Sequence, residues 1–388
     1  MSEKKKRVVV TYIEAGMGHI VTAQAIADAL KEKYGEELDI IENYTLRDSG
    51  KPFMQRFERY LVSEVKKHSA WKGYSAFQMW CMYLLGSSKN TLKFIHQTVF
   101  HRETWATVRE FEKLDPDMIV CTHFFVLYAA IVYRKKVKPS CKVVLYCPDN
   151  MIHGWWDNRV DKLYTNCDNA TKDAIRFKFP QERILQAFFP TRKQVIEANE
   201  SKAFYREKFG IPQDKFAVVI ADGAYAKAMT KKVASELLKS DLPLTICVLA
   251  GRNEKLKAEL DAIKEQVKPN ITMLTFGFVK DAPQLYGACD LFVTKAGPNA
   301  MLDSVMMNTP LIIDYYASPI EKASKRLFVD EKNCGYYIDK PKKIREKIEF
   351  LIQNDEEMQK LREAVKFFDK SQNGAGQIAE DLRKLLEE

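Results

Sequence analysis

The sequence predicts an α/β protein made of two doubly wound, Rossmann-like domains that face each other across a cleft. Short β-branched runs alternate with amphipathic helical segments, and this alternation restarts near the middle of the 388 residues. A glycine turn also joins a strand to a helix in each half. Strands that alternate with helices form parallel sheets, because each crossover between parallel strands needs a covering helix.

The first half opens as a strand, a helix and a second strand. Residues 8–13 are apolar and mostly β-branched, which favours a buried strand, and 20–34 place apolar side chains on one helical face. The same reasoning predicts a helix at 125–134 and further strands at 38–41, 118–122, 142–147 and 161–165. The segment 52–105 interrupts the alternation, because it is long, helical and rich in aromatic residues.

The second half repeats the alternation after residue 190. The predicted strands are 216–220, 244–250, 271–276, 291–294 and 311–313. The predicted helices are 228–238, 255–266, 282–288, 300–307 and 321–330. We therefore expect an N-terminal domain over 1–190 and a C-terminal domain over 191–370. The last helix, 371–388, is a candidate for packing back on the first domain.

The composition narrows the cellular setting and the kinds of site. The net charge of +9 favours anionic partners such as nucleotides, phosphates or acidic lipids, without choosing among them. The eight cysteines form no CxxC pair, so we expect free, buried thiols in a reducing compartment and no zinc site. No apolar run suits a signal peptide or a membrane-spanning helix, which predicts a protein that is cytoplasmic or held on a membrane surface.

A first candidate site is the turn after the first strand, where Gly16 and Gly18 precede His19. Glycines let backbone N–H groups approach a ligand, and the positive end of the following helix favours negative charge. A histidine titrates near neutrality, so His19 can act as a general base. It can also be an ordinary polar residue at a helix start.

A second candidate is 294–303, again where a strand gives way to a helix. The N–H groups after Gly297 suit a diphosphate, and Pro298 suits an early helical position. Asp303 lies one turn into that helix, where its carboxylate can bind ribose hydroxyls or simply complement the helix dipole. Lys295 can stabilise a leaving diphosphate or serve a structural role.

A third candidate follows a buried strand, at the edge where open parallel sheets bind ligands. It contains Asp149, His153 and Trp156, and the alternative is a loop whose tryptophans only pack. Asp115 and Asp117 have the spacing of a metal-binding DxD motif. Asp-Pro before a strand is usually a turn, and we interpret this pair as a turn.

Taken in order along the chain, these motifs resemble those of monogalactosyldiacylglycerol synthases and bacterial processive diacylglycerol glucosyltransferases. The resemblance rests on 16–19, 149–156, 160–164, 251–253, 277–279, 288–290, 294–298, Pro310, Glu321 and Gly335. More distantly, the chain resembles the cell-wall transferase that adds N-acetylglucosamine to a lipid-linked muramyl peptide. The match runs along nearly the whole chain, and the block after residue 277 is its specific part.

The resemblance implies a GT-B glycosyltransferase that moves a hexose from a UDP-sugar to diacylglycerol, with inversion, no metal and no other cofactor. It implies that His19 is the catalytic base. On the acceptor side it implies Gly16, Gly18, Asp149, His153 and Trp156. On the donor side it implies Gly223, Gly251, Arg252, Asn253, Phe278, Val279, Lys295, Gly297, Pro298, Asn299, Asp303 and Glu321. Of these, the pair 278–279 is expected near the uracil, 297–299 near the diphosphate, and Glu321 at the donor sugar.

The sequence departs from the family pattern at three places. Asp303 stands where the family has a glutamate, Ile320 stands where a glutamine is usual, and the loop 221–225 has fewer glycines. Two rival functions stay open. One is a UDP-sugar epimerase of the same architecture, which needs no acceptor, and the other is a non-catalytic nucleotide-sugar-binding protein.

A lipid acceptor requires contact with a bilayer, and 52–105 is the candidate segment. Aromatic residues mixed with Arg and Lys suit an interface with anionic headgroups. The alternative is a core helix, which has the same composition over 74–85. We expect a protein on the inner face of the cell membrane, with a UDP-sugar, a lipid acceptor and an anionic membrane surface as partners, and no nucleic acid.

Overall fold

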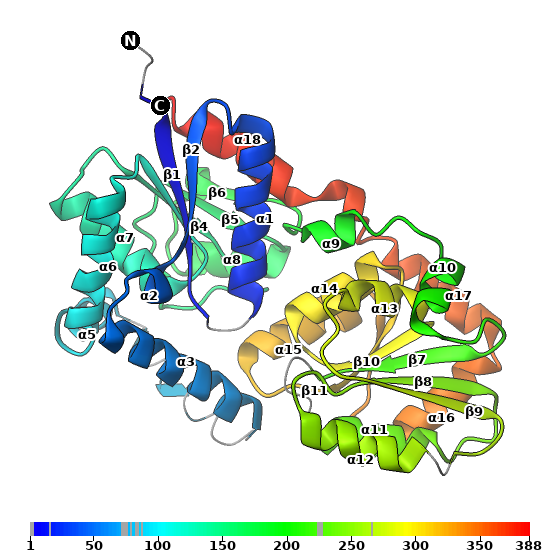
Figure 1. Cartoon of the computed structure of the whole chain (residues 1–388). Coiled ribbons are helices and arrows are strands. Elements are labelled where there is room, and N and C mark those ends of the chain that lie inside the picture. Colours follow the sequence, from blue (N-terminus) through cyan, green and yellow to red (C-terminus); the bar gives the residue numbers. More distant parts are fainter. Residues whose placement is uncertain are drawn as a thin grey trace. The chain divides into compact units, whose positions relative to one another are not determined.

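The structure is a computed structural model of the chain, and it describes residues 4–14, 17–70, 77, 80–81, 85–86, 88–222, 228–264 and 267–388. The chain forms two compact units. Unit 1 comprises 1–192, 317–320 and 373–388, and unit 2 comprises 193–316 and 321–372. The chain therefore leaves unit 1 after Arg192 and returns to it for its last sixteen residues at Asn373, as the colours of Figure 1 show.

Unit 1 contains a six-stranded sheet with the order β2-β1-β3-β4-β5-β6, and every pairing in it is parallel. Its strands are β1 (Lys6–Tyr12), β2 (Leu38–Tyr44), β3 (Met118–Cys121), β4 (Lys142–Tyr146), β5 (Lys162–Thr165) and β6 (Ile184–Gln186). Its helices include α1 (Met17–Tyr34), α2 (Thr45–Asp48), α3 (Pro52–Ala70), α5 (Lys89–Thr98), α6 (His101–Leu114), α7 (Phe124–Lys136), α8 (Asp168–Arg176) and α18 (Gly374–Leu385). The predicted doubly wound sheet is confirmed, and the short β6 is an addition to it.

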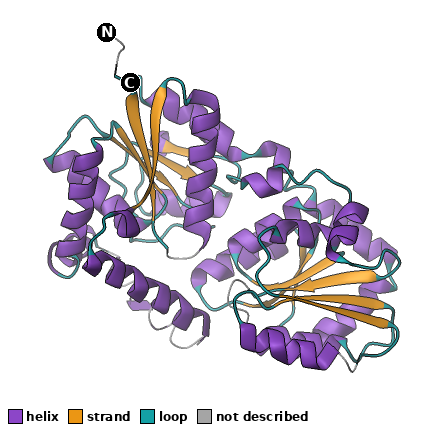
Figure 2. Ribbon diagram, in the orientation of Figure 1, coloured by secondary structure: helices purple, strands orange, loops and turns teal. Residues whose placement is uncertain are grey.

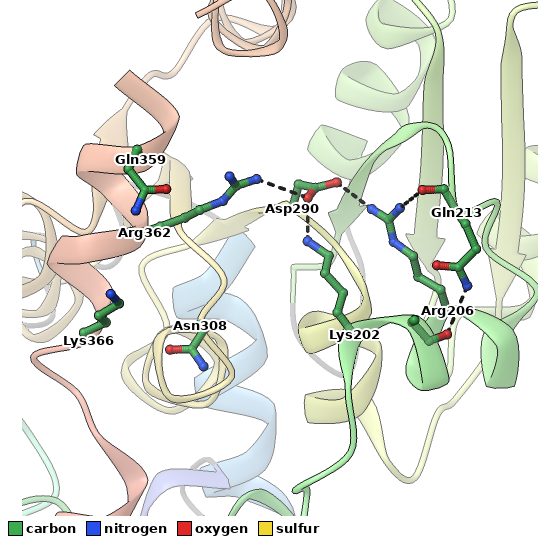
Figure 3. Close-up of a pocket in the computed structure, with 9 residues that line it drawn as sticks. Lys202, Arg206, Gln213, Asp290, Asn308, Gln359, Arg362 and Lys366 are labelled. Atoms are coloured by element: carbon green, nitrogen blue, oxygen red, sulfur yellow. Dashed lines mark hydrogen bonds and ion pairs between the residues drawn. The ribbon is translucent and has the colours of Figure 1, made fainter. Parts of the chain in front are cut away.

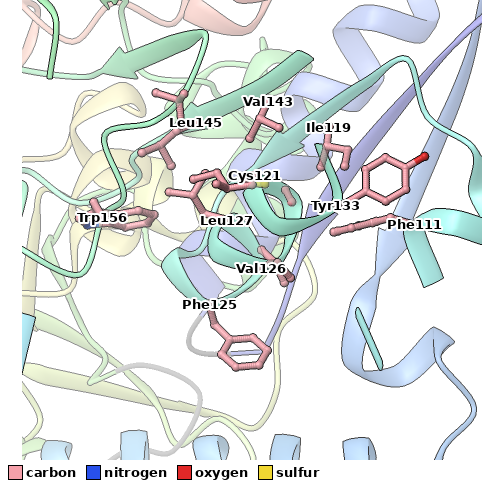
Figure 4. Close-up of a cluster of buried hydrophobic side chains, with 14 of the residues drawn as sticks. Phe111, Ile119, Cys121, Phe125, Val126, Leu127, Tyr133, Val143, Leu145 and Trp156 are labelled. Carbon is pink, nitrogen blue, oxygen red and sulfur yellow. The ribbon is translucent and has the colours of Figure 1, made fainter. Parts of the chain in front are cut away.

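Alternate residues of the strands in unit 1 face opposite layers of helices. Val8 and Val10 pack with α1 and α18, whereas Val9 packs with α6 and α7. Figure 2 shows helices on both faces of this sheet, and Figure 4 shows the α6 and α7 layer with Phe111 and Val126. Successive side chains of a strand point to opposite faces, so burial on both faces explains why these strands are apolar throughout.

Helix α18 completes one of these layers, although it lies far from α1 in the sequence. Ile378 and Leu382 are fully buried in the same cluster as the α1 side chains, and Figure 1 shows α18 in red beside α1 in blue. Asn373 fixes the start of the helix, because its side-chain oxygen accepts the N–H of Ala375 at 3.1 Å and that of Thr191 at 2.9 Å. The last helix is therefore an integral part of unit 1.

Unit 2 contains a second six-stranded parallel sheet, with the order β12-β11-β10-β7-β8-β9. Its strands are β7 (Phe216–Ile220), β8 (Leu244–Leu249), β9 (Ile271–Phe276), β10 (Leu291–Lys295), β11 (Leu311–Tyr315) and β12 (Gly335–Tyr337). The helices that follow Arg192 include α9 (Lys193–Ile196), α10 (Lys202–Phe209), α11 (Ala228–Leu237), α12 (Glu254–Lys264), α13 (Ala282–Ala288), α14 (Pro298–Met306), α15 (Pro319–Lys325), α16 (Pro341–Ile352) and α17 (Asp355–Val365). The second predicted parallel sheet is thus confirmed.

The Asp115 and Asp117 pair forms the predicted turn. Asp115 ends α6 in the left-handed conformation, with a φ of 47°. The ammonium of Lys138 lies 2.9 Å from a carboxylate oxygen of each aspartate. One lysine therefore holds the turn before β3, and the DxD spacing is structural.

Two expectations from composition can also be compared with the structure. All eight cysteines are free and seven are buried, with Cys81 partly exposed, which confirms the prediction of free thiols. Among the described residues, no helix combines the length and the apolar character that crossing a membrane requires.

Candidate active site

His19 lies where the order of the sheet in unit 1 changes direction. From β1 the chain turns to β2 on one side and later to β3 on the other, so the loops after β1 and β3 diverge at their carboxyl ends. Open parallel sheets bind ligands at such a switch point. Helix α1 follows β1 and carries His19 in its first turn, while Thr122 and His123 follow β3. Two loops far apart in the sequence therefore meet at His19.

The hydrogen bonds of the His19 ring fix its tautomer. Its Nδ1 lies 2.6 Å from the carbonyl oxygen of Thr122, which can only accept, so Nδ1 carries the proton. The Nε2 atom of the neutral ring keeps its lone pair. The Thr122 hydroxyl in turn donates to the backbone carbonyl of His19 at 2.9 Å. A backbone carbonyl thus orients this imidazole, a role that a carboxylate has in a Ser-His-Asp triad.

Two further histidines accompany His19, and all three rings are neutral near pH 7. The rings of His19 and His123 meet edge to face with their centroids 4.7 Å apart. Burial lowers the pKa of His19 to about 4, against the opposing effect of its bond to Thr122. Burial also lowers the pKa of His153 to about 4, and the charge of His19 adds to this. The pKa of His123 lies well below its usual range, because of burial and then of His19 and His153.

The other two histidines hold the opposite tautomer. The Nδ1 of His123 accepts the N–H of Phe125 at 3.1 Å and so caps α7. The Nδ1 of His153 accepts the N–H of Trp155 at 3.3 Å. An amide N–H can only donate, so each of these neutral rings carries its proton on Nε2. The cluster therefore combines one ring with an acceptor Nε2 and two rings with a donor Nε2–H, a set that suits a hydroxyl group.

Asp149 and Trp156 lie on the loop after β4 in different surroundings. Burial raises the pKa of Asp149 to about 7, so its carboxyl group is partly protonated at neutral pH. Trp156 is a core residue, with its ring 5.7 Å from that of His153 and 5.9 Å from that of Phe124. The packing alternative therefore applies to Trp156, which supports His153 from the hydrophobic core.

A backbone contact fixes the segment 85–86 against this loop. A Cβ atom on Gly154 would lie 2.1 Å from the carbonyl oxygen of Gly86. A Cβ atom on Gly86 would lie 2.6 Å from the indole of Trp155. Both positions require glycine because the chains approach so closely. Residues 85–86, within the aromatic segment 52–105, are therefore in direct contact with the loop that carries His153.

In unit 2, two predicted donor loops meet at the carboxyl ends of β8 and β9. Gly251 has a φ of 59°, which favours glycine, and its carbonyl oxygen lies 3.8 Å from the position of a Cβ on Gly277. The Arg252 guanidinium lies 5.2 Å from the centre of the Phe278 ring, which is 62% exposed. Asn253 caps α12, since its side-chain oxygen accepts a backbone N–H at 3.1 Å. The arrangement offers an exposed aromatic face beside a cation.

The other donor loop opens α14 at the switch point of the second sheet. Gly297 is the N-cap of α14, and Pro298 and Asn299 form its first turn, directly after β10 and beside the central strand β7. The ammonium of Lys295 lies 2.6 Å from a carboxylate oxygen of Glu321. Two residues predicted separately on the donor side therefore form one ion pair, next to backbone N–H groups that suit an anion.

The remaining predicted residues take more ordinary positions. Asp303 lies inside α14 and is 4% exposed, and Val279 is half-buried next to Phe278. Gly18 is the second residue of α1. Gly16 and Gly223 lie outside the described residues, so their predicted roles stay predictions.

Sequence reasoning missed Thr122 and His123, and it missed the pairing of Lys295 with Glu321. A Thr-His pair directly after a buried strand was the available signal for the first. It became informative only once β3 was known to lie beside β1, because the ends of these two strands then share one edge. The ion pair joins residues 26 positions apart and has no local signal.

Two family profiles match the chain, one in each half. Residues 19–187 match the monogalactosyldiacylglycerol (MGDG) synthase family, and 201–367 match the glycosyl transferases group 1 family. The processive diacylglycerol beta-glucosyltransferase of Bacillus mycoides (strain KBAB4) is 24% identical over 366 residues. That alignment covers 94% of this chain and 90% of the Bacillus protein.

Solved structures with a similar fold cover nearly the whole chain. MurG of Acinetobacter baumannii gives a TM-score of 0.63 at 12% identity, covering 98% of this chain and 99% of MurG. The UDP-GlcNAc 2-epimerase of Neisseria meningitidis, bound to UDP-GlcNAc, gives 0.62 at 9% identity, covering 98% and 100%. At these identities the likeness establishes the fold alone. The family matches identify the chain as a glycosyltransferase, and the solved structures give it the GT-B fold; it is similar to the monogalactosyldiacylglycerol synthases and the processive diacylglycerol glucosyltransferases.

Proposed function

We propose that this protein moves a hexose from a UDP-sugar to a lipid, with diacylglycerol as the acceptor, by inversion and without a metal. The observation that carries the proposal is the neutral His19 ring, whose Nε2 is a proton acceptor at the switch point of unit 1. The lipid acceptor is supported by the family of residues 19–187 and by the Bacillus relative. The UDP donor is supported by the epimerase of the same fold, whose structure contains UDP-GlcNAc.

In the proposed reaction, the acceptor oxygen bonds to the anomeric carbon as the bond from that carbon to the UDP oxygen breaks. His19 Nε2 takes the proton of the acceptor hydroxyl. A base with a pKa of about 4 does not deprotonate an alcohol beforehand, so the proton moves as the new bond forms. The resulting imidazolium keeps its Nδ1–H bond to the carbonyl of Thr122, which stabilises the new charge. A single displacement of this kind inverts the anomeric carbon.

The leaving diphosphate gains negative charge in this step. We propose that the N–H groups at the start of α14 receive it, together with Lys295, in place of a metal. Glu321 holds the Lys295 ammonium at 2.6 Å, and we propose that its carboxylate also accepts a hydrogen bond from a donor-sugar hydroxyl. The exposed Phe278 ring offers a stacking surface for the uracil. We propose that no further cofactor is used.

We also propose that the protein works at the inner face of the cell membrane as a peripheral protein. Large apolar side chains that are exposed gather in the segment 52–105: Tyr60, Phe77, Trp80, Leu85, Phe94, Val99 and Trp105. The exposed side chains of Arg56 and Arg59 belong to the same segment, on α3. Exposed aromatic residues beside cations suit a bilayer with anionic headgroups.

The proposal is tested with the full chain, diacylglycerol in vesicles that contain phosphatidylglycerol, and a panel of UDP-sugars. Released UDP and glycolipid are both measured. We expect one donor to release UDP only when diacylglycerol is present, with an equal amount of glycolipid formed. We also expect the rate to fall when the anionic lipid is replaced by a neutral one, since the surface attraction is electrostatic.

Other results of this experiment point to the rival functions. An epimer of the UDP-sugar formed without acceptor would make the protein an epimerase. Binding of UDP with neither product would favour a nucleotide-sugar-binding protein without catalysis. Equal rates on neutral and anionic vesicles would show that the protein does not require an anionic membrane surface.

The pH dependence of kcat/KM provides a second prediction. The neutral form of His19 is the base, and its pKa is lowered to about 4, so activity is retained as the pH falls below 6.5 and is lost near pH 4. Initial rates between pH 4 and pH 9 check this. The Asp149→Asn variant is the control, because the pKa of Asp149 is about 7 and its protonation can add a separate limb. A fall in kcat/KM with a midpoint near pH 6.5 that persists in this variant would contradict the assignment of His19, with its lowered pKa, as the base.

A further inference from the structure

A pocket of about 640 Å³ lies in unit 2, away from the predicted donor loops (Figure 3). Three of its lining residues precede strands of the sheet. Asp290 comes directly before β10, Gln213 is three residues before β7, and Asn308 is three residues before β11. The pocket is therefore at the amino ends of these parallel strands, whereas the loops after β8, β9 and β10 are at the carboxyl ends. It is not part of the proposed donor site.

Both carboxylate oxygens of Asp290 accept hydrogen bonds from residues of unit 2. One oxygen accepts from the Lys202 ammonium at 2.5 Å. The other accepts from the Arg206 guanidinium at 2.7 Å and from the Ala217 N–H at 2.8 Å. Arg206 is buried and gives its remaining donors to backbone carbonyls, including those of Ala288 and Gln213. These contacts form a structural lock between α10 and the start of β10.

Two further cations, at the end of helix α17, make none of the hydrogen bonds of this lock. Arg362 on α17 and Lys366, the C-cap residue of that helix, lie four positions apart, so they project from one side of it. Arg362 approaches the occupied Asp290 only to 3.6 Å, and its side chain is 44% exposed. Lys366 pairs with Glu363 on the surface, where both side chains are more than half exposed, and such a pair contributes little. Figure 3 shows Arg362 reaching across from α17 toward Asp290, with Lys202 and Arg206 on the other side.

The rest of the lining also favours an anion. The amides of Gln359 and Asn308 line the same pocket and can donate hydrogen bonds. Four basic side chains and one carboxylate line the pocket, and that carboxylate already has partners in Lys202 and Arg206. A guanidinium has five N–H donors and an ammonium has three, so each has donors beyond its present ion pair that can bind phosphate oxygens through charge-assisted hydrogen bonds.

We propose that this pocket is a second anion site, distinct from the donor site, that binds a phosphate group through Arg362 and Lys366. The ligand class is a phosphate ester or diphosphate, either free or carried by a lipid headgroup. Occupancy links α17 to α10 through the lock at Asp290, so the bound anion stabilises unit 2.

The experiment is calorimetric titration of the full chain with sodium pyrophosphate at constant ionic strength, together with thermal melting. The Arg362→Gln/Lys366→Gln variant removes both of these cations. The matched control is Lys342→Gln/Lys343→Gln, which removes two exposed cations from α16 of the same unit. Lys295→Gln accounts for pyrophosphate bound at the donor loop.

We expect the 362/366 variant to bind pyrophosphate about tenfold more weakly at this site and to lose the rise in melting temperature, with the control and Lys295→Gln retaining both. The single Lys366→Gln variant, at an exposed position, serves if the double variant does not fold. Equal binding by wild type and the 362/366 variant would overturn the proposal, as would binding lost only in Lys295→Gln.

A second arm separates the two sources of phosphate. Vesicles of phosphatidylcholine with and without phosphatidylglycerol are sedimented with wild type and with the 362/366 variant. Binding to the anionic vesicles that depends on Arg362 and Lys366 assigns the site to a lipid headgroup. Dependence seen with pyrophosphate alone assigns it to a free phosphate compound.

Discussion

His19→Ala should lower kcat by about 10²–10⁴-fold, the usual contribution of a positioned general base. The reason is geometric: Nδ1 is tied to the carbonyl of Thr122, so only Nε2 can take a proton, and alanine removes it. KM for the donor should change little, because the residues proposed to bind the donor belong to unit 2. Initial rates over a range of both substrates separate the two parameters.

The matched control is His101→Ala, which removes an exposed histidine from α6 in the same unit. It should keep full activity. UDP binding by the His19 variant should equal that of wild type, which confirms that the protein is folded. If the His19 variant retained more than about a tenth of the wild-type kcat, another group would have to be the base.

Gly374→Ala should destabilise unit 1 by at least about 2 kcal/mol, the scale of a steric clash in a packed region. A Cβ atom at this position would lie 1.8 Å from the carbonyl oxygen of Phe188, a backbone atom that cannot rotate away. The start of α18 must therefore shift, and its contacts with the α1 layer are strained. Urea unfolding followed by tryptophan fluorescence measures this, because all five tryptophans belong to unit 1.

Gly376→Ala provides the control within the same helix. Its added Cβ would meet only the flexible end of the Lys33 side chain, 3.4 Å away, and alanine favours a helix over glycine. This variant should be as stable as wild type or slightly more stable. Equal destabilisation by the two substitutions would mean that helix propensity, and not the contact with Phe188, determines the effect.

Local patterns predicted most of the fold, because the decisive interactions are local. The strand at 216–220 and the helix at 282–288 have the predicted bounds, since an apolar run or a helical stripe is read within one segment. The Pro298 position at the start of α14 was predicted for the same reason. The strand at 335–337 was missed, because three residues carry no period and the strand exists only through its pairing with β11.

The sites were less predictable, because their contacts join distant segments. The histidine cluster takes one residue from α1, one from the end of β3 and one from the loop after β4. Predicting it therefore requires knowledge of the strand order. The lock at Asp290 joins residues 84 and 88 positions apart. Gly86 and Gly154 are in contact because two backbone segments approach closely. A glycine allows such an approach, but its presence in the sequence does not show where one occurs.

The return of the chain to unit 1 also governs the order in which the protein can mature on the ribosome. Residues 1–192 emerge first, yet their α1 layer lacks Ile378, Leu382 and the rest of α18 until unit 2 has been synthesised. A fragment that ends at Arg192 therefore exposes part of its core to solvent, whereas unit 2 is nearly contiguous and can fold on emergence. Expression of unit 1 alone therefore requires that a linker rejoin 373–388 to the end of that fragment.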